Sequence, residues 1–110
     1  KALFHEAKSL GMDTVIEVHD QRDLDKALGI DAEMIGINNR NLKTMEVDLG
    51  ITLELAAKIP AGKIVISESG VRELEDVQFL ASAGIKAVLI GAVFMEADDI
   101  GAEVKRVMAW

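Results

Sequence analysis

Four short apolar runs, each followed by the pattern of an amphipathic helix, limit this chain to very few folds. The runs lie at residues 14–20, 32–40, 63–70 and 86–94, and the helical patterns lie at 1–11, 21–29, 51–59, 72–84 and 98–110. Alternating strands and helices predict an α/β fold with a parallel sheet and right-handed crossovers. A doubly wound sheet and a (β/α)8 barrel both have this order of elements.

Polar residues at the ends of the runs favour the barrel. Glu17, Asn38 and Glu68 lie near the ends of the first three runs. Because side chains alternate between the faces of a strand, all three can point to one side of the sheet and converge. A barrel carries its functional groups there, at the carboxyl ends of its strands, whereas the strands of a doubly wound sheet are apolar throughout.

The length of the chain corresponds to half of a TIM barrel. It has 110 residues, whereas a complete (β/α)8 barrel takes about 200 or more. We expect residues 1–110 to form a single half-barrel domain, (β/α)4 with a preceding helix. The sequence opens inside a helical pattern and without methionine, which indicates a piece of a longer protein.

Composition excludes several kinds of partner. The formal net charge is -7, with 19 acidic and 12 basic residues, whereas nucleic acids and anionic membranes require a basic surface. The absence of cysteine excludes disulfides and thiolate chemistry. No apolar run reaches the roughly 18 residues that a membrane span needs. We expect a cytoplasmic protein that binds neither nucleic acid nor membrane.

Glu68 is the strongest candidate for a catalytic group. A carboxylate at the end of an apolar strand loses hydration unless it is paired. It can act as a general base or stabilise positive charge in a reacting molecule; alternatively, it is a structural carboxylate bonded to backbone or to Arg40. Arg40 either pairs with a carboxylate of a ligand or orients Glu68 or Glu17. Asn38 offers both a donor and an acceptor.

Two glycine turns lie near the ends of the third and fourth runs. Ser69-Gly70 and Gly91-Ala92 can present backbone N–H groups to a phosphate, as the last two loops of a barrel commonly do. Alternatively, both glycines only permit tight turns. Glu17 and His19 share a face of the first run, but two ligands do not complete a metal site, so we expect no metal.

Five sequence motifs together resemble a known enzyme family. They are "VIEVHD", "IGINNRNL", "VDL", "SESGV" and "GAVFMEADD", and their order and spacing resemble indole-3-glycerol-phosphate synthase of tryptophan biosynthesis. The resemblance covers essentially all 110 residues and corresponds to the C-terminal half, the fourth helix and then βα units five to eight. Phosphoribosylanthranilate isomerase shares "GINNRNL" loosely, but "VIEVHD" and "SESG" together favour the synthase.

The resemblance implies a barrel enzyme that needs no metal or organic cofactor. The family closes and decarboxylates 1-(2-carboxyphenylamino)-1-deoxyribulose 5-phosphate and then dehydrates the product to indole glycerol phosphate. Carried over residue by residue, the resemblance implies catalytic Glu17 (a base in the dehydration), Asn38 and Glu68, substrate-binding Arg40, Ser69 and Leu89, and a phosphate cradle at Gly70, Gly91 and Ala92.

Two departures from the family limit what the chain can do alone. The family often has a hydroxyl or glutamate after the second glycine, where this chain has Ala92 and Val93, so a side-chain donor to the phosphate is lost. The catalytic lysines of the family lie on the early strands and are absent, since Lys63 and Lys86 begin strands at the opposite rim. We expect no more than trace activity from the isolated chain.

The edges of a half-barrel predict partners. The first and last strands leave unpaired edges beside an apolar lumen face, which invites association. We expect a homodimer or pairing with an N-terminal half-barrel, and a phosphorylated small molecule as the substrate. The alternative function is a self-associating half-barrel scaffold that at most binds phosphorylated ligands.

Overall fold

The computed structural model describes residues 2–41 and 43–108. Its strands are β1 (Val15–Val18), β2 (Met34–Asn38), β3 (Ile64–Glu68) and β4 (Ala87–Leu89). Its helices are α1 (Ala2–Ser9), α2 (Gln21–Gly29), α3 (Gly50–Ala56), α4 (Leu74–Ser82), α5 (Ala92–Met95) and α6 (Ile100–Met108). None of these helices has the length and apolar content needed to cross a membrane.

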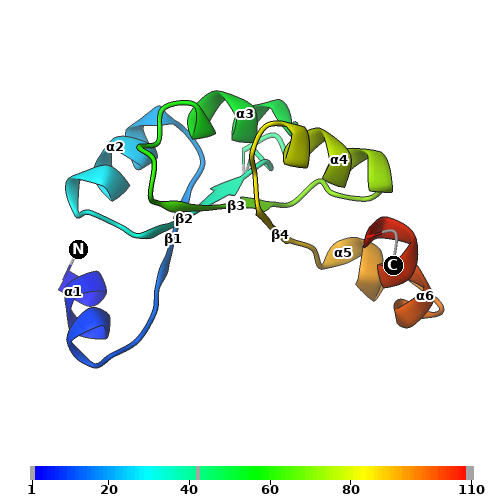
Figure 1. Cartoon of the computed structure of the whole chain (residues 1–110), viewed down its shortest axis with the longest axis horizontal. Helices are drawn as coiled ribbons and strands as arrows, with labels where there is room; N and C mark the ends of the chain where they lie inside the picture. Colours follow the sequence, from blue (N-terminus) through cyan, green and yellow to red (C-terminus); the bar gives the residue numbers. More distant parts are fainter. Residues whose placement is uncertain (1, 42, 109–110) are drawn as a thin grey trace.

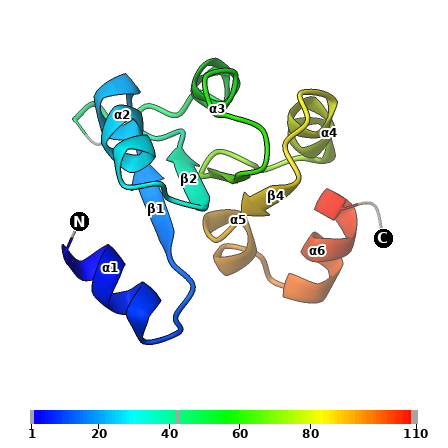
Figure 2. The ribbon, with the colours of Figure 1, turned by 60° about the vertical axis from the view of Figure 1, so that its left-hand side comes forward.

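The strands form one parallel sheet in the order β1-β2-β3-β4. Helices α2, α3 and α4 lie along one side of this sheet (Figure 1). From a second direction α1, α2, α3, α4 and α6 form an arc around the strands, with α1 at one end and α6 at the other (Figure 2). A parallel sheet inside an arc of helices is half of a TIM barrel, so the predicted fold class is confirmed.

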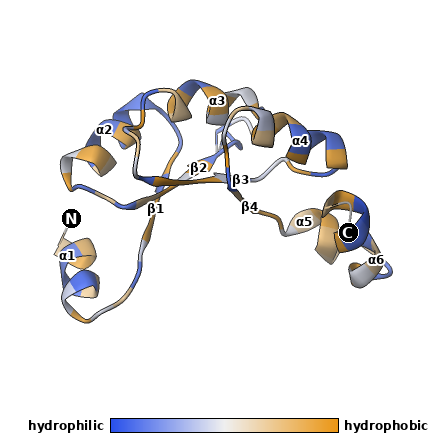
Figure 3. Ribbon diagram, in the orientation of Figure 1, coloured by the Kyte–Doolittle hydropathy of each residue, from blue (hydrophilic) through white to orange (hydrophobic). Residues whose placement is uncertain are grey.

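Alternation along the strands divides their residues between the helix-covered face and the open face. Ile35 and Ile37 of β2 are fully buried beneath the helices and join a core that includes residues of α2 and α3. Each buried isoleucine contributes roughly 1.5–3 kcal/mol of hydrophobic stabilisation. On the open face the exposed apolar side chains are Val15 (45%), Ile64 (53%) and Leu89 (59%). Apolar residues accordingly run along the strands in Figure 3.

Acidic residues begin three of the helices. The Asp20 carboxylate accepts a hydrogen bond from the backbone N–H of Asp23 at 2.8 Å, and Asp99 accepts one from the N–H of Ala102 at 3.1 Å. Glu73 caps α4 through a capping box. Each cap satisfies a free N–H group of the first turn and stabilises the helix by about 1 kcal/mol. Asp99 is thus the cap of the last helix, α6.

The fourth strand is shorter than the sequence pattern indicates. The apolar run 86–94 predicts a strand throughout, but β4 ends at Leu89 and α5 begins at Ala92. The Gly91 carbonyl accepts hydrogen bonds from the N–H groups of Phe94 and Met95, at 3.1 and 2.9 Å. Phe94 packs against the buried cluster of α4 and α6. Partial burial of Phe94 by a helical turn explains why an apolar stretch here is not a strand.

Candidate active site

Glu17 and Asn38 meet at the carboxyl ends of β1 and β2. Asn38 Nδ2 donates a hydrogen bond to Glu17 Oε1 at 3.0 Å. Asn38 Oδ1 accepts one from the backbone N–H of Arg40 at 2.9 Å. Because a backbone N–H can only donate, this contact fixes which end of the amide faces Glu17. The structure therefore brings these two side chains together on the open face of the sheet.

Glu68 lies beside this pair, at the end of β3, and only 7% of its surface is exposed. Gly36 provides the space, because a Cβ at that position would overlap the Glu68 carboxyl. Burial raises the pKa of Glu68, and a hydrogen bond from its protonated carboxyl to Glu17 and the charge of Glu17 raise the pKa further, whereas His19 lowers it. Glu68 therefore keeps its proton to a higher pH than an ordinary glutamate, which suits a group that transfers protons.

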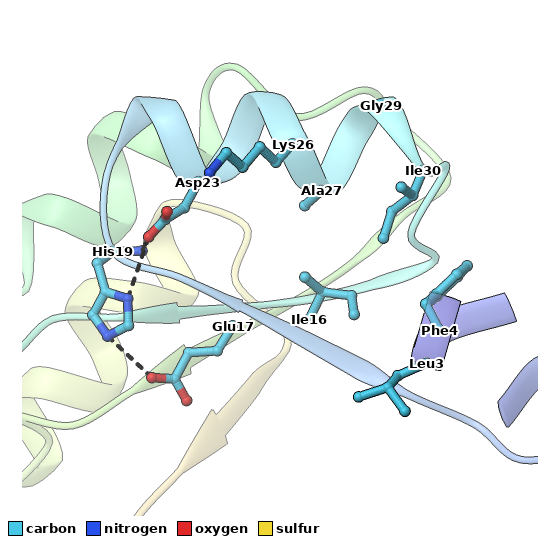
Figure 4. A pocket seen from close by; sticks show the side chains of 10 residues that line it. All are labelled: Leu3, Phe4, Ile16, Glu17, His19, Asp23, Lys26, Ala27, Gly29 and Ile30. Carbon is cyan, nitrogen blue, oxygen red and sulfur yellow. Dashed lines mark hydrogen bonds and ion pairs between the residues drawn. The ribbon is translucent and has the colours of Figure 1, made fainter. Parts of the chain in front are cut away.

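His19 lies at the edge of this cluster, between two carboxylates (Figure 4). Its Nε2 atom is 3.1 Å from Glu17 Oε1, and its Nδ1 atom is 3.4 Å from Asp23 Oδ2. Across residues 2–41 and 43–108, no group of three or more histidines, aspartates and glutamates is arranged to hold a metal ion. His19 therefore contributes an electrostatic contact to Glu17 in this structure.

The groove drawn in Figure 4 is large but is not the candidate active site. It measures about 740 Å³ and lies beside β1, between α1 and α2. Apolar side chains such as Leu3, Phe4 and Ile16 line most of it. Of the residues predicted to form a site, it contains only Glu17.

A second cavity brings most of the predicted site residues together. It measures about 580 Å³ and lies at the carboxyl ends of β3 and β4. The predicted site residues that line it are Arg40, Glu68, Ser69, Gly70, Leu89, Gly91 and Ala92. Glu17 and Asn38 do not line this cavity, but they adjoin it through Glu68. The cavity thus combines a protonatable carboxyl, an apolar wall and two backbone turns.

The turn after β3 has an unusual backbone. Ser69 and Gly70 have φ angles of 70° and 87°, both in the left-handed region. A Cβ on Gly70 would overlap Val47 of the loop that follows β2. Glycine at this position is therefore required by both the backbone angle and the space.

Arg40 contacts backbone rather than a carboxylate. Its Nη1 atom donates to the Met45 carbonyl at 3.2 Å. Among the described ion pairs none joins Arg40 to Glu17 or Glu68. Arg40 lines the cavity from the loop after β2, and an arginine at such a position can pair with an anionic group of a bound molecule.

Sequence reasoning missed a set of buried polar residues behind the site. Asn39, Thr52 and Ser67 are each fully buried, and their side chains hydrogen-bond to one another. A signal existed, because Asn39 and Ser67 occupy strand positions that alternation assigns to the apolar, helix-covered face. Arg72 was also missed; it lines the cavity and pairs with Glu96 at 3.3 Å.

The fold and the cavity define a class. This chain is an α/β half-barrel with a carboxylate cluster and glycine turns at the carboxyl ends of its strands, the position at which TIM-barrel proteins place their active sites. The family model described as indole-3-glycerol phosphate synthase matches residues 1–107. The chain therefore belongs to the indole-3-glycerol phosphate synthase family.

Several relatives carry that name. The chain is 48% identical to the indole-3-glycerol phosphate synthase of Bordetella pertussis over 103 residues, which are 94% of this chain and 39% of the relative. It is 50% identical to that of Caldanaerobacter subterraneus subsp. tengcongensis over 93 residues, 84% of this chain and 36% of the relative. For Acetivibrio thermocellus the identity is 47%, with 94% of this chain and 40% of the relative covered. The chain thus spans about two fifths of the length of these relatives.

Proposed function

We propose that this chain is the C-terminal half of an indole-3-glycerol phosphate synthase and forms one half-barrel unit over residues 1–110. The observation that carries the proposal is the cavity of about 580 Å³, where Glu68 lies next to the turns at Gly70 and Gly91. Membership of the family supplies the substrate class, a carboxyphenylamino deoxyribulose phosphate, and the product, indole glycerol phosphate.

The cavity can serve the two ends of such a substrate differently. Backbone N–H groups of Gly70, Gly91 and Ala92 bind the phosphate, and Leu89 packs beneath the aromatic ring. Because 59% of the Leu89 surface is exposed, a ring can cover it and remove apolar surface from water. Arg40 and Ser69 bind the polar groups between these two ends.

The carboxylates and Asn38 act on the reacting part of the substrate. Glu17 takes a proton in the dehydration step. Glu68, whose pKa is raised by burial and by Glu17, exchanges protons with Glu17. Asn38 holds Glu17 in place through the 3.0 Å hydrogen bond. Decarboxylation breaks the bond between ring carbon and carboxylate and releases carbon dioxide, and dehydration releases water, so neither step requires an oxidant or a cofactor.

Ring closure needs an acid that this chain does not supply. Protonation of a carbonyl during carbon–carbon bond formation requires a positioned donor. Lys63 Nζ instead bonds Asp31 Oδ1 at 2.9 Å and the Ala32 carbonyl at 2.8 Å, at the opposite rim. We therefore propose that the isolated chain has at most trace synthase activity and that turnover requires the preceding barrel units.

Calorimetry with indole glycerol phosphate tests the proposed site. We expect binding that inorganic phosphate weakens by competition, together with turnover only when an N-terminal half-barrel of a family member is added. Absence of binding heat would contradict the proposed ligand site. Ordinary turnover by the chain alone would contradict the proposal that turnover requires an N-terminal half-barrel.

A second candidate function is self-association as a half-barrel scaffold, and the surface area favours it. The chain exposes 7162 Å², whereas a compact monomer of 11.9 kDa exposes about 5,900 Å². The difference of roughly 1,300 Å² is larger than the surface of about 800 Å² that each partner buries in a standard protein–protein interface. We propose that the edges β1 and β4 pair with the strands of a second copy or of an N-terminal half. Sedimentation that shows a compact monomer of the isolated chain at micromolar concentration would contradict self-association.

A further inference from the structure

Asn39 uses every hydrogen-bonding position of its amide in a fully buried environment. Its Nδ2 atom donates to Ser67 Oγ at 2.9 Å and to the Ser69 carbonyl at 3.1 Å. Its Oδ1 atom accepts from the Thr52 backbone N–H at 3.1 Å and from Thr52 Oγ1 at 2.7 Å. An asparagine amide has two donor and two acceptor positions, so none is left for water or for another residue.

The neighbouring backbone groups determine the direction of each bond. The Thr52 N–H can only donate and therefore faces Oδ1, whereas the Ser69 carbonyl can only accept and therefore faces Nδ2. Thr52 Oγ1 gives its proton to Asn39, so in the 2.8 Å contact between the hydroxyls Ser67 must donate to Thr52. The side chains of Asn39, Ser67 and Thr52 thus form a closed ring of hydrogen bonds that all run in one direction, which we call the Asn39 ring.

The Asn39 ring connects directly to the candidate active site. Asn39 directly follows Asn38, the last residue of β2, and its backbone N–H donates to the Glu68 carbonyl at 2.8 Å. Its side chain holds the carbonyl of Ser69, the residue with a φ angle of 70°. Glu68 therefore lies between two residues that the ring fixes, Ser67 and Ser69.

Pairing with buried backbone groups explains Asn39, which bonds the Thr52 N–H and the Ser69 carbonyl. It does not explain the hydroxyls of Ser67 and Thr52, whose described side-chain bonds lie within the ring. Alternation places Asn39 and Ser67 on the same side as the fully buried Ile35 and Ile37, where an apolar side chain packs without desolvating polar groups. A buried polar network stabilises a protein little more than well-packed apolar residues do, although it specifies one arrangement of its members. The advantage of the Asn39 ring is therefore orientation.

We propose that Asn39 is a positioning residue that, through Ser67 and Thr52, aims the Glu68 carboxyl at Glu17 and holds the Ser69–Gly70 turn in its left-handed form. The inference rests on the proposed function for the roles of Glu68 and Gly70 as ligand-contacting residues. Asn39 itself does not line the cavity.

Two substitutions at Thr52 separate orientation from packing. Thr52→Val keeps the shape and the backbone N–H but breaks the ring, whereas Thr52→Ser keeps the hydroxyl and loses only a methyl group. The readout is the titration midpoint of the Glu68 carboxyl, followed by carbon NMR of the isolated chain. Burial sets this midpoint together with Glu17 and His19, and Arg40 and Arg72 also line the cavity.

In the unsubstituted chain and in Thr52→Ser, we expect a titration midpoint above that of an ordinary glutamate. In Thr52→Val we expect a midpoint lower than in these two proteins, because a loosened Glu68 moves towards water and away from Glu17. Ser67→Ala breaks the same ring through a substitution on β3 instead of α3, and we expect the same lowering of the midpoint. Ile35→Val, a core substitution on β2, is the stability control and should leave the midpoint unchanged.

Equal midpoints in Thr52→Val, Ser67→Ala and Thr52→Ser would overturn the inference. A lowering of the midpoint in Ile35→Val as large as that in Thr52→Val would also overturn it. An ordinary midpoint in the unsubstituted chain would also overturn it, because Glu68 would not then be held at Glu17. The titration uses no ligand. A chain that titrates as expected but does not bind indole glycerol phosphate therefore contradicts the proposed function and leaves the role of Asn39 supported.

Discussion

Gly36 and Glu68 lie side by side on neighbouring strands, and the Glu68 carboxyl occupies the space that a side chain at Gly36 would fill. Both residues are buried. The glycine therefore allows an ionisable side chain to fold back over the sheet and to reach Glu17 on β1. A strand interior normally disfavours glycine, which indicates that close approach of another group is the reason for it here.

Gly36→Ala tests this relationship. Because the added methyl group displaces the Glu68 carboxyl, we expect the free energy of unfolding to fall by about 1–3 kcal/mol and indole glycerol phosphate to bind more weakly. Denaturant unfolding and calorimetry measure the two effects. Gly29→Ala is the control: no atom lies within 4 Å of its Cβ, and alanine in helix α2 should stabilise by roughly 0.5–1 kcal/mol. A Gly36→Ala protein with unchanged stability and affinity would show that Glu68 does not occupy this space.

Stability should depend on pH through Glu68. Burial and Glu17 raise its pKa in the folded protein above the ordinary 4.5, so the folded state binds the proton more tightly than the unfolded chain does. This stabilisation is fully present below the ordinary pKa and is lost as the pH rises through the raised pKa. Glu68→Gln, which mimics the protonated form, should therefore unfold at higher urea concentration than the unsubstituted chain at pH 7, with the difference shrinking towards pH 4.

Glu54→Gln removes the same negative charge from an exposed position on α3. It therefore controls for the altered net charge in that comparison. A Glu68→Gln protein that is less stable than the unsubstituted chain at pH 7 would mean that the carboxylate form is the one the fold favours.

Gly70 and Gly84 form a matched pair for testing the turn after β3. Their φ angles are 87° and 86°, so alanine at either position carries the same left-handed penalty of roughly 1–2 kcal/mol. Only at Gly70 does the new Cβ also overlap Val47. We expect Gly70→Ala to cost about 1–3 kcal/mol more than Gly84→Ala, and Gly70→Ala alone to weaken phosphate-ligand binding.

The double variant Gly70→Ala with Val47→Ala removes the overlap and should recover part of the extra cost. Equal losses of stability from Gly70→Ala and Gly84→Ala would place Val47 away from the turn, and equal effects on ligand affinity would remove the turn from the binding site.

The arrangement of the strands was predictable because two simple periodicities determine it. Alternating apolar runs and helical patterns give the order of the sheet, and the period of two along a strand places Glu17, Asn38 and Glu68 on the open face. The same reasoning predicts the exposed positions of Val15 and Leu89. These predictions need only the direction of each side chain, which the sequence position within a strand supplies.

Three features were not predictable in this way. Residues 92–94 are apolar, so their sequence is compatible with both a continued strand and a helical turn after β4. Only the packing of Phe94 in the folded chain decides between the two. Asn39 was overlooked beside Asn38, because its role arises from Thr52, a residue of another element that approaches only when the chain is folded. The pairing of Glu17 with Glu68 likewise depends on the space above Gly36.

The most direct test of the central claim is to record the backbone amide NMR signals of the chain while indole glycerol phosphate is added. The binding site described above predicts that the largest shifts occur at Ser69, Gly70, Gly91 and Ala92. Unchanged signals at these amides, or shifts concentrated around Lys63 and Lys86 at the opposite rim, would contradict a phosphate-binding site at the carboxyl ends of β3 and β4.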